Sequence, residues 1–248
     1  MFRIFCLILI VCFGVRVRAE TNETLVANYV PSLSGQPWPR VPVVAYTNDA
    51  SGLWVHPTAP KDFPTLQEIH ETNSDFTTVV LRLPDGTVFK TYNDFVLGPY
   101  LAGVFSGDFN GDGVPDFMAI KPGSGCGIAG ENCTGVFAFS DNGGYRFTRV
   151  RTMGLGPHAL VQDPQIKSFR LIQTSLRAAQ SSDGRIHSFW VHRFYKWEGY
   201  SFRSDTGLPP IWIQYLNRPN HEATKLLSAK QKLKAWGDDA ASESPIEW

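Results

Sequence analysis

The sequence is best interpreted outward from the stretch Asp108-Phe109-Asn110-Gly111-Asp112-Gly113-Val114-Pro115-Asp116. Side chains that carry oxygen fall at positions one, three, five and nine of this stretch, and a glycine stands at position six. Alternate residues of a tightly wound loop can point to one side, and Gly113 permits the sharp turn that closes such a loop. The spacing therefore predicts a loop whose polar side chains face a common centre.

A hard divalent cation fits that spacing, because calcium takes six to eight oxygen ligands at about 2.3–2.6 Å. We expect the ligands to be the side-chain oxygens of Asp108, Asn110, Asp112 and Asp116 and the backbone carbonyl of Val114. Three carboxylates so close together would repel one another without a cation. The sequence thus predicts one structural Ca²⁺, and the alternative is an acidic Asx-turn loop between two strands.

The segments on both sides of the loop have the composition of strands. Gly103-Val104-Phe105 precedes it and Phe117-Met118-Ala119-Ile120 follows it. Position twelve is Ala119, so the bidentate glutamate of a helix-loop-helix calcium hand is missing. A strand-flanked DxNxDGxxD loop resembles the calcium loops of the FG-GAP and VCBS repeat families, found in integrin-type β-propeller blades and in bacterial secreted proteins. The resemblance directly covers about residues 103 to 121.

A wider similarity involves Gly123-Ser124-Gly125-Cys126-Gly127, Ile186–His192, Pro210–Tyr215 and Pro219–Trp236. Together with the loop, these segments resemble a secreted bacterial family of single-copy VCBS-like proteins that has no assigned function. The resemblance implies an exported, mainly β protein. It says nothing about what activity the protein has. The DxNxDG pattern does not recur, so a complete propeller built from copies of this unit is not expected.

Alternating apolar residues separated by turn residues predict antiparallel hairpins over residues 78–92, 135–150 and 168–197. A short strand is expected over 41–46, whereas 51–75 is expected to be loop with one helical turn near 66–70, and 152–165 to be loop. Near the end of the chain, Asn220 could cap a turn over 221–227, and Ser228-Ala229-Lys230-Gln231 is a capping-box pattern for a helix to about Trp236. The predicted fold is mainly β, an antiparallel meander of propeller-blade-like hairpins with a short C-terminal helix.

The first 19 residues have the pattern of a secretory signal peptide: a basic start, an apolar run and small or apolar residues before the expected cleavage after Ala19. An uncleaved anchor is the alternative. We expect a single domain over 20–237, a polar tail over 238–248, and a secreted or periplasmic location without a stable membrane span. Removing the signal takes three arginines and no acid, which leaves 20 basic and 23 acidic residues and no footprint for nucleic acid.

Two cysteines, Cys126 and Cys133, remain after cleavage, and an oxidising compartment favours a disulfide between them. The alternative is half of a zinc site, for which no partner residues stand nearby. The sequons at Asn22 and Asn132 matter only on a eukaryotic secretory route.

Other candidate residues have ordinary explanations. His187 and His192 are separated by five positions, so a regular strand would send them to opposite faces, where they could not share a metal ion. Neither Ser106 nor Ser124 lies in a nucleophile elbow. Aromatic residues of the last strands could form a binding surface or fill the core, namely Trp190, Tyr195, Trp197 and Trp212.

These observations lead to two hypotheses about the function of the protein. The first is a non-enzymatic exported domain, held by one calcium ion and one disulfide, that binds a protein or a glycan. The alternative is a secreted or periplasmic hydrolase that acts on cell-wall or extracellular polymer. The two hypotheses differ in whether a pocket beside the loop contains a second titratable group.

Overall fold

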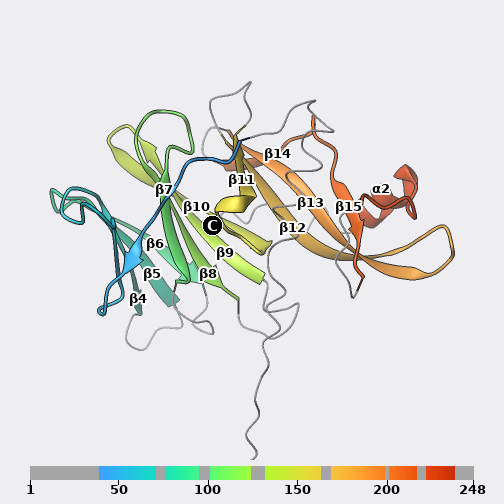
Figure 1. The fold of residues 1–248 in the computed structure, drawn as a ribbon, viewed down its shortest axis with the longest axis horizontal. Coiled ribbons are helices and arrows are strands. Elements are labelled where there is room, and N and C mark those ends of the chain that lie inside the picture. Colours follow the sequence, from blue (N-terminus) through green and yellow to red (C-terminus); the bar gives the residue numbers. More distant parts are fainter. Residues whose placement is uncertain are drawn as a thin grey trace, which may run out of the picture.

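A computed structural model describes residues 39–70, 76–94, 101–123, 132–162, 169–198, 201–216 and 222–237. The protein is mainly β, with three antiparallel sheets and one short C-terminal α-helix in this part of the chain, as the sequence predicted (Figure 1). None of the three described sheets closes on itself.

The first sheet has the strand order β2-β3-β4-β5-β6. Its strands are β2 (Thr47–Asn48), β3 (Leu53–Val55), β4 (Thr65–His70), β5 (Phe76–Arg82) and β6 (Val88–Asp94). The predicted hairpin β5-β6 is confirmed.

The expectation of loop and a helical turn between residues 51 and 75 is wrong, because β3 and β4 lie there. The prolines of this segment all fall in the connection between these two strands, where they disturb no ladder. In β4, Leu66 and Glu68 are buried and alternate with less buried neighbours. This two-residue period is that of a strand, and the prediction of a helical turn overlooked it.

The central sheet has the order β1-β7-β8-β9-β10. Its strands are β1 (Val44–Ala45), β7 (Gly103–Gly107), β8 (Asp116–Pro122), β9 (Asn132–Asp141) and β10 (Gly144–Met153). The β9-β10 hairpin is confirmed, and its turn is a tight Asn-Gly turn in which Asn142 and Gly143 both have positive φ, 48° and 82°.

The third sheet runs β11-β12-β13-β14, and β15 also pairs with β13. Its strands are β11 (Leu160–Gln162), β12 (Phe169–Gln180), β13 (Ile186–Glu198), β14 (Ser201–Ser204) and β15 (Ile211–Gln214). The predicted β12-β13 hairpin is confirmed, whereas the expected loop over 152–165 contains the 3₁₀ turn η2 (Pro157–Ala159) and β11.

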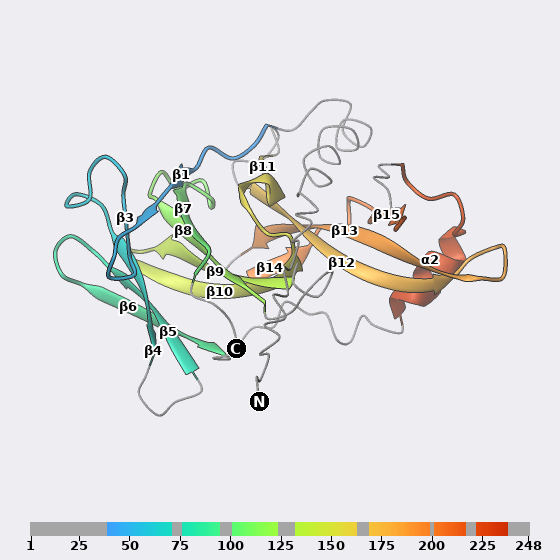
Figure 2. The same cartoon turned by 60° about the horizontal axis from the view of Figure 1, so that its bottom comes forward.

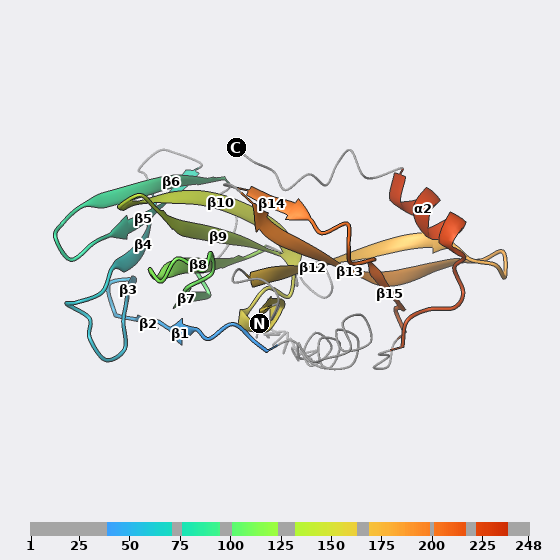
Figure 3. The ribbon, with the colours of Figure 1, turned by 90° about the horizontal axis from the view of Figure 1, so that it is seen from above.

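The three sheets stand in a row with the central sheet between the other two (Figures 1 and 3). Alternate residues of the central strands therefore enter two different apolar layers: Phe117 and Ala138 pack toward the first sheet, and Met118 and Phe137 pack toward the third. Because both faces of the central sheet are buried, β8 and β9 are nearly continuous apolar runs.

The start of the described chain joins the outer parts of this row. Residues 39–48 run from β11 past β7 to β3 (Figure 2). Backbone hydrogen bonds link Gln162 to Pro39 at 2.9 Å and Val41 to Leu160 at 3.4 Å. We call residues 39–43 the strap.

The C-terminal helix α2 (Ala229–Gly237) begins as the capping pattern predicts. The Ser228 N–H donates to Gln231 Oε1 at 2.9 Å, and the Gln231 N–H donates to Ser228 Oγ at 3.3 Å. The helical turn expected over 221–227 is not formed over the described residues 222–227, where Ala223 instead bridges Ile213.

Replacing Ser228 by alanine should lower the free energy of unfolding by about 1 kcal/mol, because the first turn of α2 loses its side-chain acceptor. Urea unfolding of Ser228→Ala beside Ser228→Asp measures this, since aspartate keeps an acceptor at the cap. Equal stability of the two variants would contradict the role of the cap.

Candidate metal centre

The loop of residues 108–115 connects β7 to β8, so both predicted flanking strands are confirmed. The pair Gly107↔Asp116 closes the base of the loop. Gly111 and Gly113 have φ of 80° and 85°, a left-handed conformation that residues with a side chain rarely adopt. These two glycines let the loop turn back within a few residues.

Backbone N–H groups of the loop bond to its own side chains. Asp108 Oδ1 accepts from the N–H groups of Gly111 at 2.7 Å and Asp112 at 3.0 Å, and Asp108 Oδ2 accepts from Gly113 at 3.0 Å. The Asp112 N–H also lies 3.0 Å from Asn110 Oδ1, while Asp112 Oδ1 accepts from the Val114 N–H at 2.7 Å. The loop is therefore wound around the side chains at positions one, three and five.

Asp116 lies beneath the loop and is fully buried. Its Oδ2 accepts from the N–H groups of Phe109 at 2.7 Å and Asn110 at 2.9 Å, and its Oδ1 accepts from Ser140 at 2.7 Å. Burial raises the pKa of Asp116 to about 6, since desolvation of the carboxylate outweighs the opposing effect of these three donors. Asp116 thus joins the loop to the central sheet.

Ser140, near the end of β9, is a site residue that the sequence did not reveal. Its Oγ donates to Asp112 Oδ2 at 2.6 Å, and Asn110 Nδ2 donates to the Ser140 carbonyl at 3.1 Å. With the N–H that it gives to Asp116, this serine contacts three of the four predicted ligand side chains. No signal in the loop spacing could have found it, because only the pairing of β8 with β9 brings it there.

The predicted ligand side chains keep some of their capacity to accept hydrogen bonds. A carboxylate has about four acceptor positions and an amide oxygen two. Asp108, Asp112 and Asp116 each accept three hydrogen bonds and Asn110 Oδ1 accepts one, which leaves one position on each. Within the described ranges, however, no three His, Cys, Asp or Glu side chains are grouped as a metal site, so a common centre for the three carboxylates stays a prediction.

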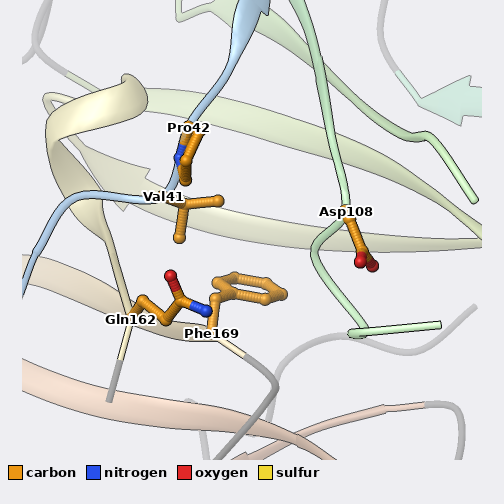
Figure 4. A pocket seen from close by; sticks show the side chains of 5 residues that line it. All are labelled: Val41, Pro42, Asp108, Gln162 and Phe169. Atoms are coloured by element: carbon orange, nitrogen blue, oxygen red, sulfur yellow. The ribbon is translucent and has the colours of Figure 1, made fainter. Parts of the chain in front are cut away.

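A pocket of about 230 Å³ opens beside the loop, lined by Val41, Pro42, Asp108, Gln162 and Phe169 (Figure 4). It lies where the strap crosses between the central and third sheets. Asp108 is the only titratable side chain among the described residues that line it. The second acid or base that a hydrolase would need is not among them.

The predicted disulfide lies partly outside the described residues, which do not include Cys126. Cys133 is buried on β9, where its Sγ is 3.3 Å from the Thr152 carbonyl and accepts the Leu155 N–H at 3.1 Å. The pairing of the two cysteines stays a prediction.

The two strand histidines lie on opposite faces of β13, as their spacing predicted. His192 is the cross-strand partner of Thr174 on β12, and Thr174 Oγ1 is 2.9 Å from His192 Nδ1. His187 contacts Asp183 through Nε2 at 2.8 Å and Gln214 through Nδ1 at 3.2 Å. Hydrogen bonds from Ser181, the Arg185 backbone and His187 hold the pKa of Asp183 well below its usual value.

Of the four aromatic residues considered as a binding surface, two are buried and two, Trp190 and Trp197, are partly buried against the core. Tyr195 and Trp212 are only 4% and 2% exposed. Trp197 stacks on Phe139 with ring centroids 3.6 Å apart, and Trp190 packs against buried residues that include Ile172, Phe194 and Ile213. Two serines were considered as candidate nucleophiles. Ser106 is buried in β7, and Ser124 lies outside the described residues.

Comparisons of the chain with protein-family models, with curated proteins and with solved structures find no match. No helix in the described segments is both long enough and apolar enough to cross a membrane. The resemblance to FG-GAP and VCBS repeats therefore remains a hypothesis that rests on the loop residues.

Proposed function

We propose that the protein is an exported β domain, stabilised by one calcium ion, that works as a non-enzymatic binding module for a protein or a glycan. The observation that carries the proposal is the winding of the loop around Asp108, Asn110 and Asp112, with an oxygen acceptor position left on each. In this proposal Asp116 and the carbonyl of Val114 complete the ligand set.

Calcium would act on stability. Asp112 and the buried Asp116 meet at Ser140, and the hydrogen-bond donors that they share are neutral. Burial favours the neutral form of Asp116, whereas a divalent cation beside it would let its carboxylate stay charged. The pocket beside Asp108 is the concave surface through which the module would contact its ligand.

Chelation should lower the melting temperature, and added calcium should restore it. At a free calcium concentration one hundred times the dissociation constant, the stabilisation is about 2.7 kcal/mol, which corresponds to roughly 5–10 °C for a chain of this size. Differential scanning calorimetry in a chelator, in calcium and in the same concentration of magnesium measures this shift.

Asp112→Asn provides the specific test, because it removes a carboxylate and keeps the shape of the side chain. Its melting temperature should no longer respond to calcium. The matched control is Asp85→Asn, which changes an exposed acid in the β5-β6 turn and should leave the response intact. A wild-type melt that is the same in chelator and in calcium would refute the proposed role of the ion.

A further inference from the structure

The β12-β13 hairpin of the third sheet has two different faces, because side chains alternate along each strand. On one face, Phe189 packs in a cluster with Leu227 and with Ala235 of α2, which lies on one side of the hairpin (Figure 3). Leu171 extends this face toward the central sheet. The opposite face, which we call the outer face, has an apolar layer of its own, formed by Val161, Ile172, Phe194, Ile211 and Ile213.

The five apolar residues of the outer face are each at most 6% exposed. Side chains on the face of a sheet are buried to this extent when a second layer lies over them. Within the described ranges, the one apolar side chain from outside the sheet that packs against this cluster is Leu208, in the connection between β14 and β15. A single partly buried leucine does not span the four strands that contribute to the cluster, so the outer face needs a further apolar cover.

We propose that residues 20–38 of the same chain are this cover, and that the outer face is their docking surface. The described chain begins at the edge of this face: the Pro39 carbonyl accepts the Gln162 N–H at 2.9 Å, and Arg40 bridges Val161. From the strap across β11, β12 and β13 to β15 is four strand spacings, or about 20 Å. A chain of this length, extended at about 3.3 Å per residue, reaches well beyond that distance.

The composition of residues 20–38 fits an apolar surface. Their large apolar side chains have the spacing i, i+1, i+4, i+5 and i+8, which places them on one side of a helix. These side chains are Leu25, Val26, Tyr29, Val30 and Leu33.

The charges of the two surfaces are also complementary. The strand register places four cationic side chains in one row across the strap, β12, β13 and β14, at one end of the outer face. They are Arg40, Arg170, Lys196 and Arg203. Two of the four form ion pairs, with Asp205 and Glu198, so the row keeps a positive balance. Residues 20–38 contain Glu20 and Glu23 and no lysine or arginine, so the segment is attracted to this row.

This inference goes beyond the proposed function, because it assigns an intramolecular partner to a surface remote from the loop residues. It does not depend on calcium. The experiment below therefore uses readouts that the failure of the calcium site would not change.

Photo-crosslinking in the full chain tests the contact directly. Tyr29 is replaced by p-benzoylphenylalanine, which keeps an aromatic side chain at this position and reacts with the C–H bonds that it touches. Tandem mass spectrometry identifies the residues that become joined. The matched control carries the same probe at Leu233, which is 70% exposed on α2, on the other side of the sheet. Mixing ¹⁵N-labelled with unlabelled protein separates contacts within one chain from contacts between two copies.

The probe at Tyr29 should react within its own chain with outer-face residues such as Ile172 and Ile213, and the probe at Leu233 should react with neither. Products that join only labelled to unlabelled chains would show that a second copy covers the face, and they would overturn the proposal. Reaction of the Tyr29 probe only with other parts of the chain, or no reaction at all, would overturn it as well.

A pair of variants in the full chain provides the second readout. Tyr29→Asp places a charge in the proposed apolar contact and should lower the melting temperature by roughly 4–8 °C. Asn28→Asp adds the same charge at the neighbouring polar position and should lower it much less. Equal shifts for the two variants would contradict the docking of Tyr29 on the outer face.

Discussion

Replacing Lys121 by methionine should lower the free energy of unfolding by about 3–5 kcal/mol, because it leaves a buried carboxylate without its cation. Lys121 on β8 forms an ion pair with Glu68 on β4, and the two side chains are only 6% and 3% exposed. Lys121 Nζ also donates to Thr77 Oγ1 at 3.1 Å, and Glu68 Oε2 accepts the Leu101 N–H at 3.2 Å. The pair thus joins the first sheet to the central sheet inside an apolar layer.

The double variant Glu68→Leu/Lys121→Met should recover most of that loss. Replacing both members of a buried pair with apolar groups of similar size removes the desolvation cost together with the attraction, and the result is often neutral or stabilising. Urea unfolding of both single variants and the double variant gives the coupling directly. A double variant as unstable as the sum of the singles would show that the two side chains act separately.

A lysine-to-methionine control is available on the surface of the third sheet. Lys196 is 2.5 Å from Glu198, but these side chains are 37% and 45% exposed. Water screens such a pair, so Lys196→Met should leave the urea midpoint unchanged within error. If Lys121→Met and Lys196→Met lowered the free energy of unfolding by similar amounts, burial of the ion pair would not explain the loss of stability.

The local patterns of the sequence were sufficient for the three hairpins, the strands beside the loop and the C-terminal helix. Turn residues such as Asn142-Gly143 between alternating apolar runs identified the hairpins, because hairpin formation is decided by neighbours in the chain. The flanking strands of the loop and the capping box at Ser228 were predicted for the same reason. The strands β3 and β4 were missed, since the two buried positions of β4 are a leucine and a glutamate and its apolar pattern is weak.

The contacts between sheets could not be predicted from one sequence. Glu68 and Lys121 are separated by 53 positions, and Ser140 lies 28 positions from Asp112. Such contacts depend on how sheets stack, and the side-chain periods of each strand do not specify a partner. For the same reason Tyr195 and Trp212 could be either core or surface until the sheets that cover them were known.

Stability should fall as the pH falls from 7 to 5, through His192. This residue is 2% exposed, and burial lowers its pKa from about 6.5 to about 3. The unfolded chain therefore binds a proton below pH 6.5 while the folded protein does not, so the contribution of the neutral histidine is fully present above pH 6.5 and is lost as the pH falls toward 3. The expected loss between pH 7 and pH 5 is about 2 kcal/mol.

The measurement must isolate this histidine, because the raised pKa of Asp116 acts in the opposite direction below pH 6. His192→Gln keeps a polar group opposite Thr174 and cannot be protonated in this range. Urea unfolding of wild type and variant at pH 7, 6 and 5 gives two curves whose other titrating groups are shared. The stability advantage of the wild type should shrink by about 2 kcal/mol over this range, and parallel curves would mean that His192 is protonated in the folded protein.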